Sequence, residues 1–345
     1  MIAKTISSGV GQVYLICSSF ILGVTGAWLI ARLGNRLGMV DLPNERSSHV
    51  QPIPKGGGVG ILAAFILSSI LLHIPIGFWL SATMLALVSL YGDRSELSPR
   101  FRLLVQIVAA IVVLAGYVVH GYFLWAPTFI FYSTKVFSGP WLLFLVVFIV
   151  GTANFYNFMD GINGIAGITG VVGFALLAIF AVNYGKDYTV AVLAICMSVS
   201  CLGFLPFNMP NAKVFMGDVG SILIGFVFAA MVVLLSKSLQ DFICLTAFIF
   251  PFYADEITTM LVRIKDGEKL TLPHRRHLYQ LLANEYGIAH WKVSMGYGLT
   301  QIFVGLSLLW LKKFGNIAMI STLLVYFCAF VILTHMVRKK LVAAT

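Results

Sequence analysis

The sequence predicts an all-α integral membrane protein, a polytopic bundle of about eleven transmembrane helices whose polar loops gather on one face. Of its 345 residues, 59% are hydrophobic and only 10% are charged, whereas a soluble domain carries roughly 25% charged residues. Apolar runs of about 20 residues, the length that spans a bilayer, follow one another closely. They leave no room for a second soluble domain, so we expect residues 1–345 to form a single transmembrane domain.

The apolar runs predict the helices in order, with boundaries accurate to ~2–4 residues. No A-x-A cleavage motif follows the first run, so we expect a retained helix rather than a signal peptide. Eleven spans would place the two termini on opposite sides of the membrane. The predicted spans are 11–33, 56–73, 75–91, 103–119, 140–155, 164–183, 189–207, 219–236, 240–262, 293–311 and 315–337.

Charged residues distinguish the two faces of this bundle. We call side one the face that carries segments 32–55, 92–102, 156–163, 208–218, 263–292 and 338–345, and side two the opposite face. Most of the 23 Lys and Arg residues lie on side one, so the positive-inside rule places it in the cytoplasm. Of the 13 Asp and Glu residues, only Asp187 and Asp241 fall on side two. No insertion rule gathers acids on one face, and we interpret them as an ion-binding site.

The first loop on side one has the sequence DLPNERSSHVQPIPKGGGVG and contains Arg46 and His49. Its glycines, Gly56 to Gly58, allow backbone to approach a ligand closely, and exposed N–H groups at a helix start favour anions. No G-K-[ST] follows, so the segment is not a Walker loop. The alternative is a polar loop with a glycine-packed helix entrance.

The second loop, YGDRSELSPRFRLLVQ, places Asp93 at the end of an apolar run, with Arg94, Arg100 and Arg102 close by. A carboxylate among arginines on the polar face is a candidate site residue. An ordinary ion pair at the membrane interface would have the same sequence, and both interpretations stay open.

The third segment, NFYNFMDGINGIAG, repeats a polar residue every three positions: Asn154, Asn157, Asp160 and Asn163. On a helix this spacing puts them close to one stripe. Such a row at a membrane face is unfavourable unless it binds something polar. The alternative is hydrogen bonding between helices through asparagine.

The fourth segment, FNMPNAKVFMGDVGS, places Asp218 after a glycine at the start of an apolar span. Asn208, Lys213 and Phe215 precede it on the same face. Mg²⁺ is commonly held by one or two carboxylates together with phosphate oxygens and water, so Asp218 with Asp160 or Asp93 would suit it. The alternative is a carboxylate that only caps a helix.

The fifth segment, RIKDGEKLTLPHRRHLYQLL, contains His274, Arg275, Arg276 and His277 between two spans. A basic cluster facing carboxylates suits a diphosphate. Charge placed there only by topology is the alternative, and zinc lacks a third ligand at suitable spacing. We interpret Asp255 and Glu256, near the end of the preceding span, as structural partners of this loop.

Together these five segments resemble the polyprenyl-phosphate N-acetylhexosamine-1-phosphate transferases, glycosyltransferase family 4, which include the phospho-MurNAc-pentapeptide translocase of peptidoglycan synthesis. The similarity runs from about Asp41 to Gln280, and its specific segments are VFMGDVGS and N-x-x-N-x-x-D-G-I-N-G. The first and fifth loops are most similar to the subgroup that initiates O-antigen synthesis, which often handles sugars such as FucNAc or QuiNAc.

The resemblance implies Mg²⁺-dependent transfer, with Mn²⁺ as an alternative, of an N-acetylamino-sugar 1-phosphate from a UDP-sugar to undecaprenyl phosphate, releasing UMP. It implies a multi-pass protein of the bacterial inner membrane, with a periplasmic N-terminus and a cytoplasmic C-terminus and active site. The expected partners are the two substrates and the lipid bilayer, without nucleic acid. Glycine-rich faces leave a homodimer open.

The resemblance also implies roles for individual residues. Asp93, Asp160 and Asp218 are implied as catalytic residues, and Asp218 and Asp160 also as metal ligands. Phe215 is placed to stack on uracil. The other implied substrate-binding residues are Asn163 and Asn208 near the base, Arg102, His274, Arg275, Arg276 and His277 at the phosphates, Arg46 and His49 at the lipid or sugar phosphate, and Asn154 and Asn157.

Two positions depart from the family pattern. Gly92 precedes Asp93 where the family usually has paired aspartates, and Asn163 stands where the family often has Asp. A lipid phosphate whose second pKa is near about 6 is already largely dianionic, so we expect a single in-line transfer in which Asp93 orients or deprotonates the acceptor. A two-step route through an aspartyl-phosphate is the rival mechanism.

Three alternative functions accompany this interpretation. The first is a UDP-GlcNAc:undecaprenyl-phosphate GlcNAc-1-phosphate transferase. The second is a secondary transporter, which would share many spans and polar breaks, although no repeat is visible and the polar residues lie at one face. The third is an inactive scaffold, suggested by Gly92.

Overall fold

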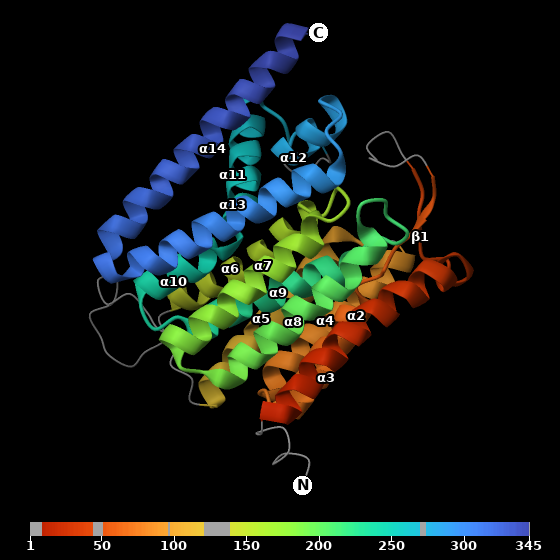
Figure 1. The fold of residues 1–345 in the computed structure, drawn as a ribbon, viewed down its shortest axis with the longest axis vertical. Coiled ribbons are helices and arrows are strands. Elements are labelled where there is room, and N and C mark those ends of the chain that lie inside the picture. Colours follow the sequence, from red (N-terminus) through yellow and green to blue (C-terminus); the bar gives the residue numbers. More distant parts are fainter. Residues whose placement is uncertain (1–8, 44–50, 96, 121–138, 270–273, 345) are drawn as a thin grey trace.

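The computed structural model describes residues 9–43, 51–95, 97–120, 139–269 and 274–344, with side chains as far as Leu341. Helices account for nearly all of this part of the chain (Figure 1). Its one small sheet pairs β1 (Val40–Asp41) with β2 (Ile53–Pro54) in antiparallel register. The predicted fold class, an all-α polytopic membrane protein, is confirmed.

Ten helical segments in the described ranges are long and apolar enough to cross a membrane. The predicted span 56–73 corresponds to the shorter helix α3 (Val59–Leu71), whose 13 residues rise only about 20 Å against a hydrocarbon core of about 30 Å. The remaining helices are α2 (Gly9–Leu37), α4 (Ile76–Arg94), α5 (Pro99–Val119), α6 (Gly139–Phe158), α7 (Ile165–Phe180), α8 (Tyr188–Asn208), α9 (Asp218–Leu235), α10 (Leu239–Thr246), α11 (Phe250–Lys265), α12 (Leu278–Gln280), α13 (His290–Leu311) and α14 (Asn316–Ala344).

Helix α9 lies at the centre of the bundle, packed against α4 and α6 (Figure 1). Its span is 89% buried inside the protein, which agrees with a sequence that is apolar on every side. By contrast, the span of α14 is only 17% buried, and its last turns, next to the C-terminus, project beyond the other helices (Figure 1). The residue that opens α9 is therefore surrounded by several elements, while α14 lies at the periphery.

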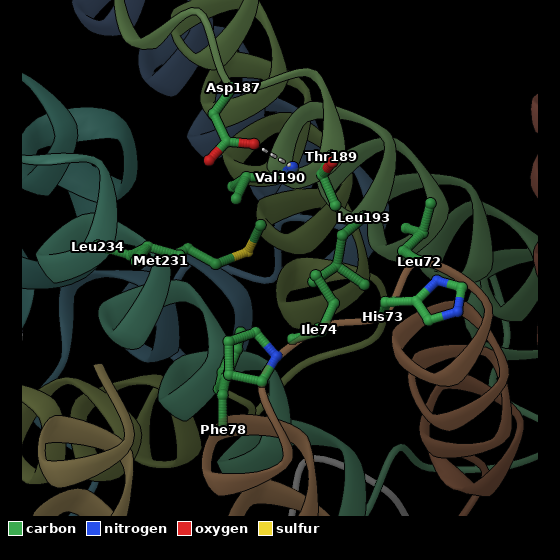
Figure 2. Close-up of a pocket in the computed structure, with 11 residues that line it drawn as sticks. Leu72, His73, Ile74, Phe78, Asp187, Thr189, Val190, Leu193, Met231 and Leu234 are labelled. Carbon is green, nitrogen blue, oxygen red and sulfur yellow. Dashed lines mark hydrogen bonds between the residues drawn. The ribbon is translucent and has the colours of Figure 1, made fainter. Parts of the chain in front are cut away.

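The two acids of side two have structural partners. Asp187 caps α8, since its Oδ1 accepts the Val190 N–H at 3.0 Å (Figure 2). Asp241 accepts the N–H of Lys237 at 3.1 Å and pairs with the Lys312 ammonium at 2.8 Å. Most of the residues that line a pocket of about 230 Å³ beside Asp187 are apolar, and the ring of His73 at its edge points away from Asp187 (Figure 2). These acids hold helix ends in place.

Candidate active site

Asp218 stands at the first position of α9, where three polar side chains meet it. Arg102 of α5 donates from Nη1 to Asp218 Oδ2 at 2.6 Å. Asn157 of α6 donates from Nδ2 to Asp218 Oδ1 at 2.9 Å, and the same Nδ2 lies 2.8 Å from Ser221 Oγ. The Asp218 side chain keeps 26% of its surface exposed. It can therefore still be reached from side one.

Asp93, near the end of α4, holds the start of α9 through the backbone. Its Oδ1 accepts the N–H of Asp218 at 3.0 Å and its Oδ2 accepts the N–H of Val219 at 3.1 Å. The carboxylate is buried, with 6% of the residue exposed. Both oxygens satisfy N–H groups that a helix start leaves without intrahelical partners. In this geometry Asp93 fixes the backbone position of Asp218.

The glycine-rich loop packs against the segment that leads into α9. Gly57 and Gly58 donate their N–H groups to the carbonyls of Phe215 and Met216, both at 2.9 Å. The N–H of Phe215 in turn donates to the Pro54 carbonyl at 2.8 Å. Protein carbonyls thus occupy the glycine N–H groups, and the structure supports the glycine-packed entrance rather than an anion cradle. Arg46 and His49, predicted in the same loop, lie outside the described residues.

Gly217 has a backbone conformation that suits glycine. Its φ is +74°, and a Cβ there would lie 2.7 Å from both Asp93 Oδ2 and the Gly56 nitrogen. Any side chain would therefore strain the backbone and collide with the carboxylate that caps α9. The glycine before Asp218 in the fourth segment is required by this close approach.

The predicted polar stripe divides into two parts. Asn154 donates from Nδ2 to Gln106 Oε1 of α5 at 2.6 Å and to the Val150 carbonyl at 2.8 Å. It therefore pairs helices, as the alternative interpretation of this segment expects. Asn157 contacts Asp218, whereas Asp160 and Asn163 lie in the turn between α6 and α7, beyond the end of the helix. The buried Gln106 was not among the predicted site residues.

Asp160 is a partly buried carboxyl close to the other two aspartates. Burial, followed by the negative charges of Asp218 and Asp93, raises the pKa of Asp160 to about 7. Within the described residues, no hydrogen-bond donor to its carboxylate is seen. A cation between Asp160 and Asp218 would favour the ionised carboxylate against the burial and the repulsion that raise this pKa.

Asn163 and Asn208 have backbone partners around the same turn. Asn208 is buried; its Oδ1 accepts the Gly164 N–H at 2.6 Å and its Nδ2 donates to the Val214 carbonyl at 3.0 Å. Asn163 donates from Nδ2 to the Pro210 carbonyl at 3.1 Å, and its own carbonyl accepts the Ser294 hydroxyl of α13 at 2.8 Å. Asn208 therefore fixes the loop before Phe215, while Asn163 stays partly exposed.

The basic segment is anchored by a buried carboxylate. Asp255 of α11 is fully buried and accepts the N–H groups of Leu278 at 2.8 Å and Tyr279 at 3.3 Å. The Tyr297 hydroxyl donates to the same carboxylate at 2.7 Å. His277 is also buried, with Nδ1 3.7 Å from Asp255 and Nε2 3.4 Å from a Glu256 oxygen. Asp255 and Glu256 are partners of this loop, as the sequence predicts.

The remaining basic side chains surround an open cavity of about 600 Å³. Arg276 pairs with Asp266 at 2.5 Å and with Glu268 at 2.9 Å. Burial and then the neighbouring cations lower the pKa of His274 to about 4, so its imidazole is neutral at pH 7. The lining residues are Arg263, Gly267, Glu268, Lys269, His274, Arg275 and Arg276.

Tyr279 connects the basic segment, His274–His277, with the turn between α6 and α7 that carries Asp160. Its hydroxyl donates to the Phe158 carbonyl at 3.1 Å, at the end of α6. Gly161 lies so close that a Cβ there would overlap the Tyr279 ring and hydroxyl. The basic segment therefore lies against the turn that carries Asp160. Sequence reasoning missed Tyr279 because a tyrosine after a basic loop has no distinguishing pattern.

The carboxylates suit a metal that needs few protein ligands. The described residues contain no cluster of three His, Cys, Asp or Glu side chains placed around one ion position. Mg²⁺ is usually held by one or two carboxylates, with phosphate oxygens and water in the other positions. Asp218 and Asp160 match that donor set, and Arg102 forms an ion pair with Asp218.

The Asp218 carboxylate at a buried helix start, contacted by a guanidinium and an amide, forms a polar site on one face of a polytopic membrane protein. Residues 75–236 match the family model described as Glycosyl transferase family 4. A decaprenyl-phosphate N-acetylglucosaminephosphotransferase from Mycobacterium leprae is 30% identical over 336 residues, covering 86% of this chain and 81% of the relative.

Two further relatives are named for the same kind of transfer. A probable undecaprenyl-phosphate N-acetylglucosaminyl 1-phosphate transferase from Bacillus subtilis is 25% identical, covering 90% of this chain and 89% of its own length. An undecaprenyl-phosphate alpha-N-acetylglucosaminyl 1-phosphate transferase from Salmonella typhi is 28% identical, covering 77% and 75%. The chain belongs to glycosyl transferase family 4, as the sequence motifs predict, and is a multi-pass membrane transferase of that family.

Proposed function

We propose that this protein transfers an N-acetylhexosamine 1-phosphate from a UDP-sugar to undecaprenyl phosphate, releasing UMP, in a Mg²⁺-dependent reaction that initiates a cell-surface polysaccharide such as O-antigen. The observation that carries the proposal is the meeting of Arg102, Asn157 and Asp218 at the start of α9, beside Asp160. The names of the three relatives support this reaction class and favour UDP-GlcNAc as the first donor to test.

The proposed reaction is one in-line displacement. An oxygen of the lipid phosphate attacks the sugar-proximal phosphorus, the bond from that phosphorus to the UMP oxygen breaks, and the anomeric C–O bond stays intact. Mg²⁺ held by Asp218 and Asp160 would neutralise charge on the diphosphate. Arg102 balances the Asp218 carboxylate and lies within reach of phosphate oxygens bound there, while Asn157 orients the carboxylate.

Asp93 has a positioning task in this scheme. Its two oxygens already accept N–H groups of α9, and the acceptor phosphate is largely ionised at neutral pH without a base. The absence of a second aspartate at Gly92 is compatible with this reaction.

The orientation and location are part of the same proposal. The excess of Lys and Arg on side one supports a cytoplasmic active site and C-terminus, with the N-terminus in the periplasm, in the inner membrane of a bacterium. Nucleotide sugars would then reach the site from the cytoplasm.

The test uses the purified full-length protein in lipid nanodiscs with undecaprenyl phosphate, Mg²⁺ and a panel of UDP-N-acetylamino sugars that includes GlcNAc, FucNAc and QuiNAc. We expect UMP release with one donor, reduced at least about 100-fold in Asp218→Ala, since removal of one charge-stabilising group commonly reduces kcat by about 10²–10³. Asp187→Asn, which alters a helix cap on side two, is the matched control and should retain activity.

Other outcomes separate the rivals. No UMP release from well-folded protein with any donor would overturn the proposal in favour of an inactive scaffold or a transporter. Solute uptake into sealed vesicles would then identify a transporter. A phosphoenzyme trapped by rapid quench and released by hydroxylamine would replace the single displacement with the two-step route.

A further inference from the structure

The side-one end of α14 is tied to the basic segment by direct contacts. Arg338 donates from Nη2 to the Arg276 carbonyl at 2.6 Å, and the same nitrogen lies 3.4 Å from the Thr259 hydroxyl. One residue earlier, the Val337 carbonyl accepts the Tyr286 hydroxyl at 2.8 Å. Helix α14 packs against α11 and against the π-helical turn Leu281–Glu285 that follows α12. A helix that otherwise lies at the periphery thus reaches the polar face of the protein.

The Arg276 carbonyl is the point at which three elements meet. Thr259 of α11 lies 3.4 Å from that carbonyl and donates to Asp255 at 3.2 Å. Asp255 accepts the N–H groups of Leu278 and Tyr279, two and three residues after Arg276. The backbone of the basic segment is therefore held by α11 from one side and by Arg338 from the other.

Arg338 contributes the charged hydrogen bond in this arrangement. A guanidinium donating to a carbonyl stabilises more than a neutral donor does, and the half-buried position limits competition from water. Most of the preceding residues of α14 are apolar, and little of that span is buried inside the protein. Arg338 therefore supplies a charged contact between α14 and the loop.

The position of this backbone decides where two functional groups lie. The Arg276 side chain lines the basic cavity and pairs with Asp266 and Glu268. The Tyr279 hydroxyl rests on the Phe158 carbonyl, beside the turn of Asp160. A displacement of the Arg276 carbonyl would therefore move the cations of the cavity relative to the aspartates.

We propose that Arg338 is a positioning residue of the active site, through which α14 holds the His274–His277 segment where it meets the diphosphate of the donor. This inference rests on the proposed function for the identity of the diphosphate. It brings into the working site a helix that lies outside the matched family region, residues 75–236. Arg338 itself acts through the Arg276 backbone and contacts neither substrate.

The kinetic test compares Arg338→Ala with Arg338→Lys and Lys339→Ala. Loss of the charged hydrogen bond is expected to raise the KM for the UDP-sugar about 10-fold or more, with a smaller change in the KM for undecaprenyl phosphate. Arg338→Lys keeps a cationic donor and should recover part of the loss. Lys339→Ala removes an exposed positive charge from the same turn and should behave as wild type.

Hydrogen–deuterium exchange gives a readout that needs no activity. In Arg338→Ala, backbone N–H groups of residues 276–286 should exchange faster, while those at the start of α9 should not change. An unchanged donor KM and unchanged exchange would overturn the proposal, as would an equal effect of Lys339→Ala or a uniform acceleration of exchange. If wild-type protein lacks transferase activity, the proposed function fails while the exchange result still decides whether Arg338 positions the segment.

Discussion

At the residue scale, two buried carboxylates have the same task in different parts of the site. Asp93 accepts the N–H groups of Asp218 and Val219, and Asp255 accepts those of Leu278 and Tyr279. In both cases a carboxylate fixes the start of the helix that follows a functional segment. A metal ligand and a helix-capping residue are the same residue type in the same kind of place, so spacing alone could not separate them.

Asp160 makes a pH-dependent prediction at this scale. Its pKa of about 7 means that part of the population is protonated near neutral pH, and a metal requires the ionised form. We expect the apparent Mg²⁺ affinity to weaken as pH falls, approaching a factor of about 10 per pH unit below pH 7. The measurement is a Mg²⁺ titration of UMP release at several pH values between 6 and 8.

The control for this titration is Asp160→Asn, which should bind Mg²⁺ more weakly and lose the pH dependence of the Mg²⁺ affinity. The same raised pKa has a consequence for the metal-free protein. Because the folded state holds the proton more tightly than the unfolded chain, this group's contribution to stability falls as pH rises from about 4 to 7. If the pH dependence of the Mg²⁺ affinity persists unchanged in Asp160→Asn, the group that titrates is not Asp160.

At the element scale, the apolar spans were predictable because lipid imposes length and composition on them. The short elements were not. The predicted span 240–262 is divided into α10, a 3-10 turn and α11, with Pro251 in the first turn of α11, and the three residues of α12 follow no period. These breaks depend on contacts from distant segments, such as Asp255 to α12, which a local pattern does not contain.

Gly92 in α4 provides a prediction about an element. Among the described residues, a Cβ at this position would meet only the Leu97 side chain, 3.3 Å from Cδ1 and 3.8 Å from Cγ. The Leu97 side chain has to shift by a few tenths of an ångström to admit this Cβ. With that shift, Gly92→Ala should stabilise α4 by ~0.5–1 kcal/mol in denaturant titrations, since alanine restricts the unfolded chain.

Gly92→Asp restores the paired aspartates of the family and tests whether the additional carboxylate raises activity. We expect this variant to fold and its kcat not to exceed that of Gly92→Ala, because the acceptor phosphate is already ionised. A kcat that rises with aspartate but not with alanine would show instead that wild-type protein lacks a useful general base.

At the scale of the whole molecule, the uneven distribution of charge between the two faces was predictable. The structure shows what the acids on each face contact. The acids of side two, Asp187 and Asp241, hold helix ends, while three aspartates of side one converge around the start of α9. The sequence indicated that these three aspartates lie on the same face. It could not show which acids converge, because α4, α6 and α9 are brought together by packing over long sequence separations.

Orientation can be tested with the intact molecule in cells. In a background with the exposed thiols Cys17 and Cys328 replaced by serine, we expect Lys186→Cys to react with a membrane-impermeant maleimide added outside. Lys340→Cys should react only after the membrane is permeabilised, since it lies on the lysine- and arginine-rich side. The reverse labelling pattern would place side one outside the cell and remove the proposed access of nucleotide sugars.

Asp218 lies at the end of a buried helix and is partly exposed on side one. This position affects how the two reactants reach the site. Of the two proposed reactants, the UDP-sugar is soluble in water and undecaprenyl phosphate is held in the bilayer. A reaction centre at the boundary between water and bilayer lets each reactant arrive by diffusion in its own phase. The nucleotide sugar arrives from the aqueous side, and the lipid phosphate arrives by lateral diffusion in the membrane. The product then keeps its tail in the bilayer while its sugar faces water, so neither reactant has to cross into the phase that excludes it.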